Sequence, residues 1–332
     1  MTENKLLKIG ITHGDINSTN YEIIMKALAE SKLLDICTPI VYGLSKAASY
    51  YRKALDMNDF AFQFIKNIEQ ATLKKTNLLN FADHEVKIEM GNTTKFSTDL
   101  ALTSLQTAFN DLKNNHIDAI VTMPFSKSYI DINNAFKGQN HFFANNFKSQ
   151  GTTLMLVADE IKMGLLSHQT MLNQVSQQLS VESLLKNIRI VNQSLISDFF
   201  IINPKIAILS FNHNKNGNEE KEKIIPAINQ AFEEKINVFG PFPSLELFEN
   251  NSYKNFDIIL ALHYEQAMTP FHLLSEDRGV FYTAGLPIVR TAPIHHANFK
   301  NVGKNYASGQ SLRNAIYLAI NILRNRREVE RK

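Results

Sequence analysis

Histidines are the most informative chemical groups in this sequence, because four of them come shortly after predicted strands. In open α/β sheets, ligands bind beyond the carboxyl ends of the strands, so residues at these positions face a ligand site. Three neutral imidazoles brought together by the fold would hold a divalent metal and leave coordination positions free for a substrate. No pair among the four has the i, i+4 spacing of a helical metal motif, so surface or hydrogen-bonded histidines are the alternative. The four residues are His13, His168, His213 and His263.

Cationic side chains offer a second kind of chemistry, the binding of a phosphate group. The candidates are Lys127, Arg278 and Arg290. Arg290 ends the apolar run 285–289, and an arginine fixed by a rigid strand can clamp an oxyanion with two hydrogen bonds. A helix cap or an ion pair is the alternative for Arg290. The doublet His295-His296 follows, and at most one of these two rings faces a site because adjacent side chains point in different directions.

Motif and composition searches exclude several classes of protein. The sequence has no G-x-G-x-x-G turn, no phosphate-binding P-loop and no G-x-S-x-G nucleophile elbow. The net charge of +3 is spread over mixed signs, apart from a basic run at 324–332, so no nucleic-acid partner is expected. Cys37 is the single cysteine, which excludes an internal disulfide and a multi-cysteine zinc site. With no signal peptide and no apolar run long enough to span a bilayer, we expect a cytoplasmic protein without a membrane partner.

The elements that must position these residues alternate between short apolar runs and amphipathic stretches, a pattern typical of βαβ units and a mostly parallel sheet. Thr19 and Glu22 have the spacing of a capping box before a helix that starts near Tyr21. The predicted strands are Leu7–Thr12, Ala119–Thr122, Leu154–Val157, Met163–Leu166, Lys205–Leu209, Asp257–Ala261 and Leu286–Val289. The predicted helices are Ser45–Leu55, Thr98–Leu112, Val181–Leu195, Glu219–Glu233 and Ser311–Arg324.

A chain of 332 residues is long enough for two α/β lobes. We expect the first lobe to comprise residues 1–128 and 305–332, and the second residues 129–304. The return of the last helix to the first lobe rests on the general closeness of chain termini in compact domains.

The sequence resembles the 4-hydroxythreonine-4-phosphate dehydrogenases of vitamin B6 biosynthesis, as a divergent member, over almost its whole length. The matching stretches are Ile9–Asp15 with Tyr21-Glu22, Val41–Gly43, Tyr50–Leu55, Val121–Lys127, Gly240-Pro241 with Leu247-Phe248, Tyr282–Thr291 and Ala315–Ile320.

This resemblance implies two α/β/α lobes with mostly parallel sheets, like those of isocitrate and isopropylmalate dehydrogenases, with the active site in a cleft between the lobes. It also implies a homodimer with a shared active site. The implied reaction is the NAD-dependent oxidation of 4-phosphooxy-L-threonine followed by decarboxylation, for pyridoxal phosphate biosynthesis. A divalent metal (Zn, Mg or Co) would polarise the hydroxyl that is oxidised, while cationic side chains hold the phosphate.

The carry-over of the family's metal ligands is uneven. His168 matches the first ligand directly. At the second ligand, Asn214 occupies the family position and His213 lies one residue earlier, and at the third, Tyr264 occupies the position and His263 lies one residue earlier. The implied metal set is therefore His168, His213 and His263, provided that two loops shift by one residue.

Substrate positions also depart from the family. Gln139 and Asn140 replace a histidine and a threonine, His272 stands where a lysine is expected near the phosphate, and Phe281 replaces an asparagine. In the segment after the last strand, His296 replaces a glycine. By contrast Arg290 matches, as do two catalytic candidates, Asp15 and Lys127.

Two further interpretations stay open beside the metal- and NAD-dependent dehydrogenase. Because the departures concentrate at metal and substrate positions, the chain could be a catalytically lapsed member that acts as a binding or assembly protein. It could also be a dehydrogenase of another phosphorylated hydroxy acid.

Overall fold

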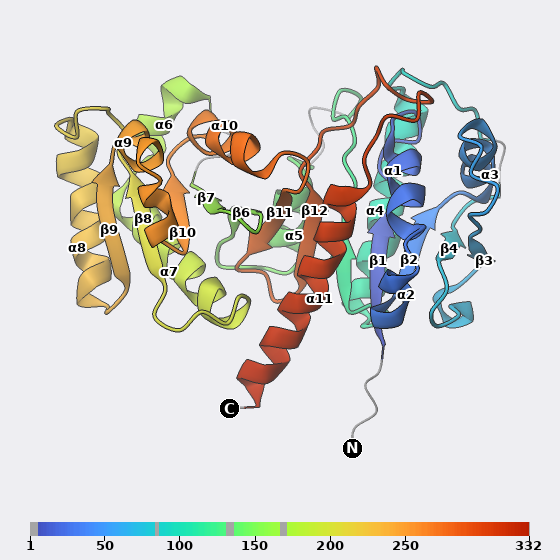
Figure 1. The fold of residues 1–332 in the computed structure, drawn as a ribbon, viewed down its shortest axis with the longest axis horizontal. Coiled ribbons are helices and arrows are strands. Elements are labelled where there is room, and N and C mark those ends of the chain that lie inside the picture. Colours follow the sequence, from blue (N-terminus) through green and yellow to red (C-terminus); the bar gives the residue numbers. More distant parts are fainter. Residues whose placement is uncertain (1–5, 84–85, 131–135, 167–170, 332) are drawn as a thin grey trace. The chain divides into compact units, whose positions relative to one another are not determined.

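The computed structural model describes residues 6–83, 86–130, 136–166 and 171–331 (Figure 1). The chain divides into two compact units. Unit 1 comprises Met1–Gly138 and Ile288–Leu323, and unit 2 comprises Gln139–Pro287 and Arg324–Lys332. The lobes expected from the sequence, 1–128 with 305–332 and 129–304, stay a prediction.

Unit 1 is built on a parallel sheet with the strand order β3-β4-β2-β1-β5-β12. Its strands are β1 (Leu7–Thr12), β2 (Cys37–Gly43), β3 (Gln63–Ile65), β4 (Asn77–Asn80), β5 (Ala119–Val121) and β12 (Val289–Pro293). Its helices are α1 (Asn20–Leu28), α2 (Lys32–Ile36), α3 (Ser45–Ala54), α4 (Lys95–Lys113) and the first part of α11 (Gln310–Glu330), with a short 3₁₀ turn at Ile68–Gln70. Every residue of β2 is buried, as expected for a parallel strand covered on both faces.

Unit 2 has a mixed sheet with the strand order β11-β6-β7-β10-β8-β9. β6 pairs antiparallel with β11 and β7, and the remaining neighbours are parallel. Its strands are β6 (Thr153–Val157), β7 (Lys162–Leu165), β8 (Lys205–Leu209), β9 (Asn237–Phe242), β10 (Ile258–Ala261) and β11 (Val280–Ala284). Its helices are α5 (Gln139–Asn146), α6 (Leu172–Gln178), α7 (Val181–Ser197), α8 (Ile225–Glu233), α9 (Ser244–Glu249) and α10 (Tyr264–Ser275), with a π-helical turn at Glu220–Ile224, a 3₁₀ turn at Ser252–Asn255 and the last turns of α11.

These sheets confirm the predicted α/β class and correct two local expectations. The predicted strand at 286–289 is wrong, because Gly285 with φ +85° and Pro287 form a turn, so the strand starts at Val289 and Arg290 lies inside it. The predicted capping box is also wrong. The Thr19 side chain makes no cap hydrogen bond, and the Glu22 carboxylate instead accepts from Lys26 Nζ and from the backbone of Ala307.

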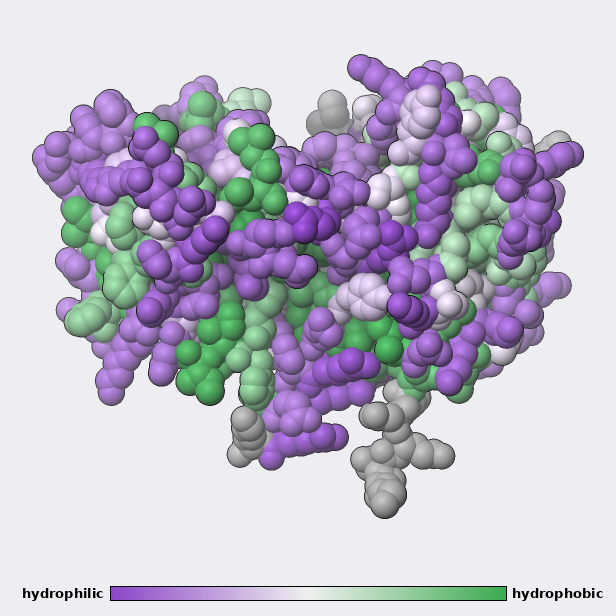
Figure 2. Space-filling view, viewed as in Figure 1, coloured by the Kyte–Doolittle hydropathy of each residue, from purple (hydrophilic) through white to green (hydrophobic). Residues whose placement is uncertain are grey.

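The surface in view is largely hydrophilic, and exposed apolar side chains interrupt it on unit 2 (Figure 2). Leu273 on α10 and Leu245 on α9 are both about three-quarters exposed. None of the helices in the described residues has the length and apolarity needed to cross a membrane.

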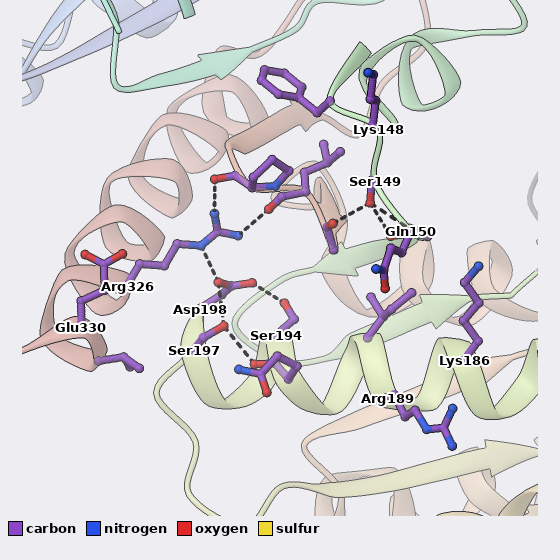
Figure 3. A pocket seen from close by; sticks show the side chains of 18 of the residues that line it. Lys148, Ser149, Gln150, Lys186, Arg189, Ser194, Ser197, Asp198, Arg326 and Glu330 are labelled. Carbon is purple, nitrogen blue, oxygen red and sulfur yellow. Dashed lines mark hydrogen bonds and ion pairs between the residues drawn. The ribbon is translucent and has the colours of Figure 1, made fainter. Parts of the chain in front are cut away.

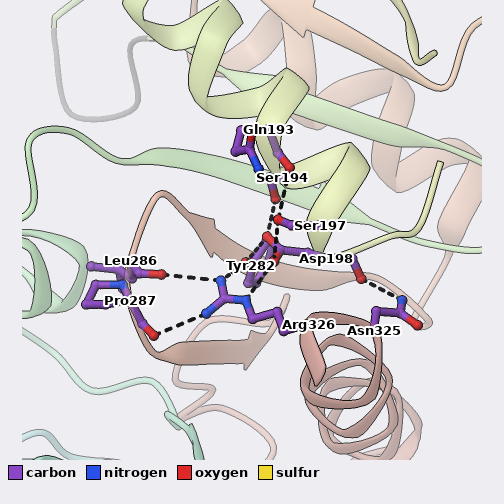
Figure 4. A network of polar contacts seen from close by, with 9 residues as sticks. All are labelled: Gln193, Ser194, Ser197, Asp198, Tyr282, Leu286, Pro287, Asn325 and Arg326. Atoms are coloured by element: carbon purple, nitrogen blue, oxygen red, sulfur yellow. Dashed lines mark hydrogen bonds and ion pairs between the residues drawn. The ribbon is translucent and has the colours of Figure 1, made fainter. Parts of the chain in front are cut away.

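A buried ion pair fastens the last turns of α11 to the rest of unit 2 (Figure 4). Arg326 Nε donates to Asp198 Oδ1 at 2.7 Å, and Asp198 is only 2% exposed. The same carboxylate accepts from Ser194 Oγ and Tyr282 Oη, each at 2.5 Å. The Arg326 guanidinium also donates to the carbonyls of Leu286 and Pro287, each at 3.3 Å. Because donors surround the carboxylate, the cost of burying its charge is offset.

We therefore expect Arg326→Ala to lower the free energy of unfolding by about 3 kcal/mol, because it leaves a buried carboxylate without its cation. Urea denaturation followed by circular dichroism measures this loss. The control is Arg324→Ala, an exposed position on the same helix, which should change stability by less than about 0.5 kcal/mol. Equal effects of the two substitutions would contradict the role of the ion pair.

Candidate functional site

The carboxyl ends of three neighbouring strands in unit 2 lie at one edge of the sheet. β10 pairs parallel with β7 on one side and with β8 on the other, so all three strands end in the same direction. Leu166 N donates to Ala261 O at 3.0 Å and ties the ends of β7 and β10 together. The loops after these strands contain His168, His213 and His263, of which His168 lies outside the described residues. The pairing of the strands therefore brings the carboxyl ends of β7, β8 and β10 next to one another.

Gln266 on α10 fixes the two described loops relative to each other. Its Oε1 accepts from Leu262 N at 2.8 Å, directly after β10. Its Nε2 donates to Ser210 O at 2.9 Å, directly after β8. One amide side chain thus bridges the ends of β8 and β10. It thereby sets the distance between the starting points of the two loops.

His263 is the N-cap residue of α10. Its Nδ1 accepts from Gln266 N at 3.4 Å, and the ring is half-buried. Burial lowers the pKa of His263 against an opposing effect of Glu265, so the ring is neutral at physiological pH. A neutral imidazole that accepts through Nδ1 carries its proton on Nε2. Metal coordination through Nε2 therefore requires the other tautomer and the loss of this cap.

Other side chains at this edge are weaker metal donors. Tyr264 is half-buried, and burial together with Glu265 raises the pKa of its phenol, so it stays protonated. His213 and Asn214 are exposed in the loop after β8. Within residues 6–83, 86–130, 136–166 and 171–331, no three His, Cys, Asp or Glu side chains gather closely enough to hold a metal ion. The imidazole donors fit a divalent metal in kind, and His168 is needed to complete the set.

The predicted substrate residues of unit 2 are on three different elements. Gln139 and Asn140 begin α5, and Asn140 Oδ1 accepts from Thr283 Oγ1 on β11 at 3.2 Å. Phe281 is a half-buried residue of β11, whereas His272 is exposed in the last turn of α10. The structure thus links Asn140 to β11, the strand that carries Phe281.

Arg290 is the best-defined cation of the edge in unit 1. It is 4% exposed on β12, and its Nε and Nη2 donate to Thr122 Oγ1 at 3.0 and 2.6 Å, at the end of β5. Burial lowers the pKa of Arg290 to about 9, so the guanidinium is still charged at neutral pH. Thr122 lies in the predicted strand Ala119–Thr122 and in the matching stretch Val121–Lys127, but neither pattern pointed to a contact with Arg290. Together these residues present a fixed cation at the carboxyl end of β5.

Asp15 and Lys127 differ sharply in their surroundings. The Asp15 carboxylate is buried and accepts from Asn17 N at 2.9 Å, Ser97 Oγ at 3.1 Å and Thr93 Oγ1 at 3.3 Å. Burial raises its pKa, and these hydrogen bonds oppose the shift. Asp15 therefore joins the loop after β1 to the start of α4. Lys127 is exposed, and its Nζ donates to Lys137 O at 3.4 Å.

The first strand-to-helix turn of unit 1 is filled by its own atoms. A Cβ added at Gly14, where φ is +65°, would lie 2.2 Å from Asn20 Nδ2 and 2.5 Å from Pro124 O. A dinucleotide-binding turn instead leaves backbone free for a pyrophosphate. The residues of this turn therefore do not fit that mode of NAD binding.

Sequence reasoning left the half-buried His295 without an assigned role. His295, in the loop after β12, has an Nε2 atom that is buried and without a hydrogen-bond partner in the described part of the chain. Burial, with a smaller contribution from His296, lowers the pKa of His295 to about 4, so this ring is neutral. The doublet was visible in the sequence, but only the fold shows which ring is enclosed.

Two of the cavities lined by described residues of unit 2 differ in character. One of about 230 Å³ lies under the edge described above, where Leu166 and Leu262 close it together with residues of α6 and α7. The other is a groove of about 960 Å³ along α7, lined also by the loop 147–151, the turn 285–287 and the end of α11 (Figure 3). None of the described residues predicted for the active site lines this groove. The smaller cavity is the one that adjoins the candidate metal loops.

Comparison with known proteins gives matches along nearly the entire chain. The family model described as "Pyridoxal phosphate biosynthetic protein PdxA" matches residues 35–319. A 4-hydroxythreonine-4-phosphate dehydrogenase of Bacteroides thetaiotaomicron is 35% identical over 98% of this chain and 91% of its own length.

Solved structures agree on the fold. That of a 4-hydroxythreonine-4-phosphate dehydrogenase from Klebsiella pneumoniae superposes with a TM-score of 0.79 at 23% identity, covering 97% of this chain and 99% of its own. A β-decarboxylating dehydrogenase from Thermococcus kodakarensis gives a TM-score of 0.50 at 11% identity, covering 95% and 82%. The second likeness confirms the predicted relation of the fold to such dehydrogenases. By sequence and by fold, this chain belongs to the family of the pyridoxal phosphate biosynthetic protein PdxA.

Proposed function

We propose that this protein oxidises 4-phosphooxy-L-threonine with NAD, after which the keto acid loses carbon dioxide, as a step of pyridoxal phosphate biosynthesis. The observation that carries the proposal is the end-to-end match to a relative named for this dehydrogenase activity. The positions of three candidate residues support it, because Asp15, His213 and His263 follow the carboxyl ends of the parallel strands β1, β8 and β10.

His168, His213 and His263 are the proposed metal ligands, and Asn214 and Tyr264 stand at the matching family positions. A bound divalent ion (Zn, Mg or Co) would supply Lewis acidity at the hydroxyl that is oxidised. The chain contributes imidazole side chains that follow adjacent strands, and the Gln266 bridge links the ends of β8 and β10, which His213 and His263 follow. His263 joins this set by giving up its cap to Gln266 N.

Arg290 is proposed to hold an oxyanion of the substrate, since its guanidinium is charged and fixed against Thr122. Gln139, Asn140, His272 and Phe281 are proposed as the other substrate contacts. Asp15 is proposed to fix the loop after β1, because its carboxylate accepts three hydrogen bonds. Lys127, which is exposed, is proposed as the catalytic residue that transfers a proton. We further propose a homodimer with a shared site, located in the cytoplasm.

A purified-protein assay tests the activity directly. We expect 4-phosphooxy-L-threonine to drive NAD reduction, and a chelator to abolish it until Mg²⁺, Zn²⁺ or Co²⁺ is restored. Absorbance at the wavelength of reduced nicotinamide reports turnover. No turnover with any of the three metals, together with no metal found by elemental analysis, would instead favour a catalytically lapsed binding protein.

The dual role of His263 gives a test with matched variants. His263→Asn keeps a capping side chain and removes the imidazole, whereas His263→Ala removes both. We expect His263→Ala to cost about 1 kcal/mol of stability and His263→Asn much less. Both should weaken Co²⁺ binding, measured by visible absorption, by roughly 10-fold or more. Unchanged Co²⁺ affinity in both variants would remove His263 from the ligand set.

Arg290→Ala should lower kcat/KM for 4-phosphooxy-L-threonine by about 100-fold, the equivalent of roughly 3 kcal/mol for charge-assisted hydrogen bonds. Steady-state kinetics with varied substrate measures the change. Thr122→Ser, which keeps the hydroxyl that accepts from Arg290, is the matched control and should leave kcat/KM near the parent value. If Arg290→Ala keeps the parent kcat/KM, the guanidinium does not contact the substrate.

A further inference from the structure

The loop between β12 and α11, residues 294–309, begins directly after the strand that carries Arg290, and its second residue is the half-buried His295. Asn298 O in this loop accepts from Thr19 N at 3.1 Å, in the segment that follows Asp15. The loop therefore contacts the segment after β1, which begins near the catalytic candidate Asp15.

A carboxylate and an ammonium group on α1 hold the far part of this loop. Glu22 Oε1 accepts from Ala307 N at 2.8 Å and from Lys26 Nζ at 2.9 Å. Lys26 Nζ donates in turn to Asn305 O at 2.9 Å and to Ala307 O at 2.8 Å. Two side chains one helical turn apart thus make three hydrogen bonds to the loop backbone. We refer to Glu22 and Lys26 as the α1 clamp.

The burial of Glu22 makes its carboxylate dependent on the groups that bind it. Glu22 is fully buried, and its Oε2 has no hydrogen-bond partner among the described residues. A buried charge is costly unless it is paired, so the carboxylate depends on Lys26 and on the loop amide together. If the loop detached, the buried carboxylate would lose the hydrogen bond from Ala307 N.

The end of the loop that leads into α11 packs against α1. Gly303 has φ +75° and Asn305 has φ +61°, both in the left-handed region that glycine and asparagine adopt readily. A Cβ added at Gly309 would lie 2.7 Å from Ala27 N, so the end of the loop packs directly on the α1 backbone. The α1 clamp and this packing fix the part of the loop before α11, and the hydrogen bond of Asn298 O holds the part after β12.

We infer that Glu22 is a positioning residue for the proposed reaction: through Lys26 and Ala307 it keeps the 294–309 loop ordered against the segment that follows Asp15. The inference rests on the proposed function. Glu22 acts through other groups and needs no contact with the substrate. A loop that must be ordered upon binding weakens the affinity for the substrate, so the clamp acts on KM more than on kcat.

Glu22→Gln is the sharpest test, because the amide oxygen can still accept from Ala307 N but no longer neutralises Lys26. The matched control is Glu30→Gln, which breaks the partly exposed ion pair of Glu30, two residues beyond the end of α1, with Arg313 (3.3 Å). A double variant, Glu22→Gln with Lys26→Met, removes both charges and covers the case in which the single variant fails to fold.

Amide hydrogen exchange measures the loop without requiring activity. In Glu22→Gln, exchange at residues 298–309 should rise about 10-fold, the equivalent of one weakened charge-assisted hydrogen bond. KM for 4-phosphooxy-L-threonine should rise roughly 10-fold while kcat stays within about threefold. Glu30→Gln should change neither quantity.

Two outcomes would overturn the inference while the proposed function stands. One is unchanged exchange in the loop of both Glu22 variants, and the other is faster exchange with an unchanged KM. An absence of turnover by the wild-type protein is a different result, because it removes the proposed function and the role of the loop with it.

Discussion

The parallel pairing of β10 with β7 on one side and β8 on the other is the constraint on which the candidate metal site depends. The register joins Ile259 to Met163 and Ala261 to Leu165, so β7 and β10 end at the same level. A Cβ at Gly164 would lie 2.5 Å from Leu260 Cδ2, so any larger residue there would displace the Leu260 side chain in this ladder. A slip of one residue would turn every side chain to the opposite face and move the histidine loops apart.

The sequence was sufficient for the features that depend on local apolar patterns. The strand Lys205–Leu209 was predicted with its observed bounds, and the strands before His168 and His263 were predicted to within a residue. That accuracy explains why the candidate edge could be located at all. The sequence was also sufficient to identify the family, because stretches such as Val121–Lys127 match family motifs.

The capping-box error comes from a contact between residues that are far apart in the chain. Thr19 and Glu22 have the spacing of a capping box, but Glu22 binds the amide of Ala307, 285 residues away. That contact leaves no trace in local spacing, because it depends on where a distant segment returns. His263 stays a proposed metal ligand, and the structure adds a local contact in which its Nδ1 accepts from Gln266 N, three residues later.

The ion pair of Asp198 and Arg326 has a consequence for synthesis of the chain. The two residues are 128 positions apart, and Arg326 follows the whole return of the chain through unit 1. While a ribosome is still adding the residues of β12 and α11, the Asp198 carboxylate has no guanidinium to meet it. Unit 2 therefore cannot complete its packing during synthesis. Its strands are synthesised before residue 326, but the Asp198 ion pair forms only after that residue has been added.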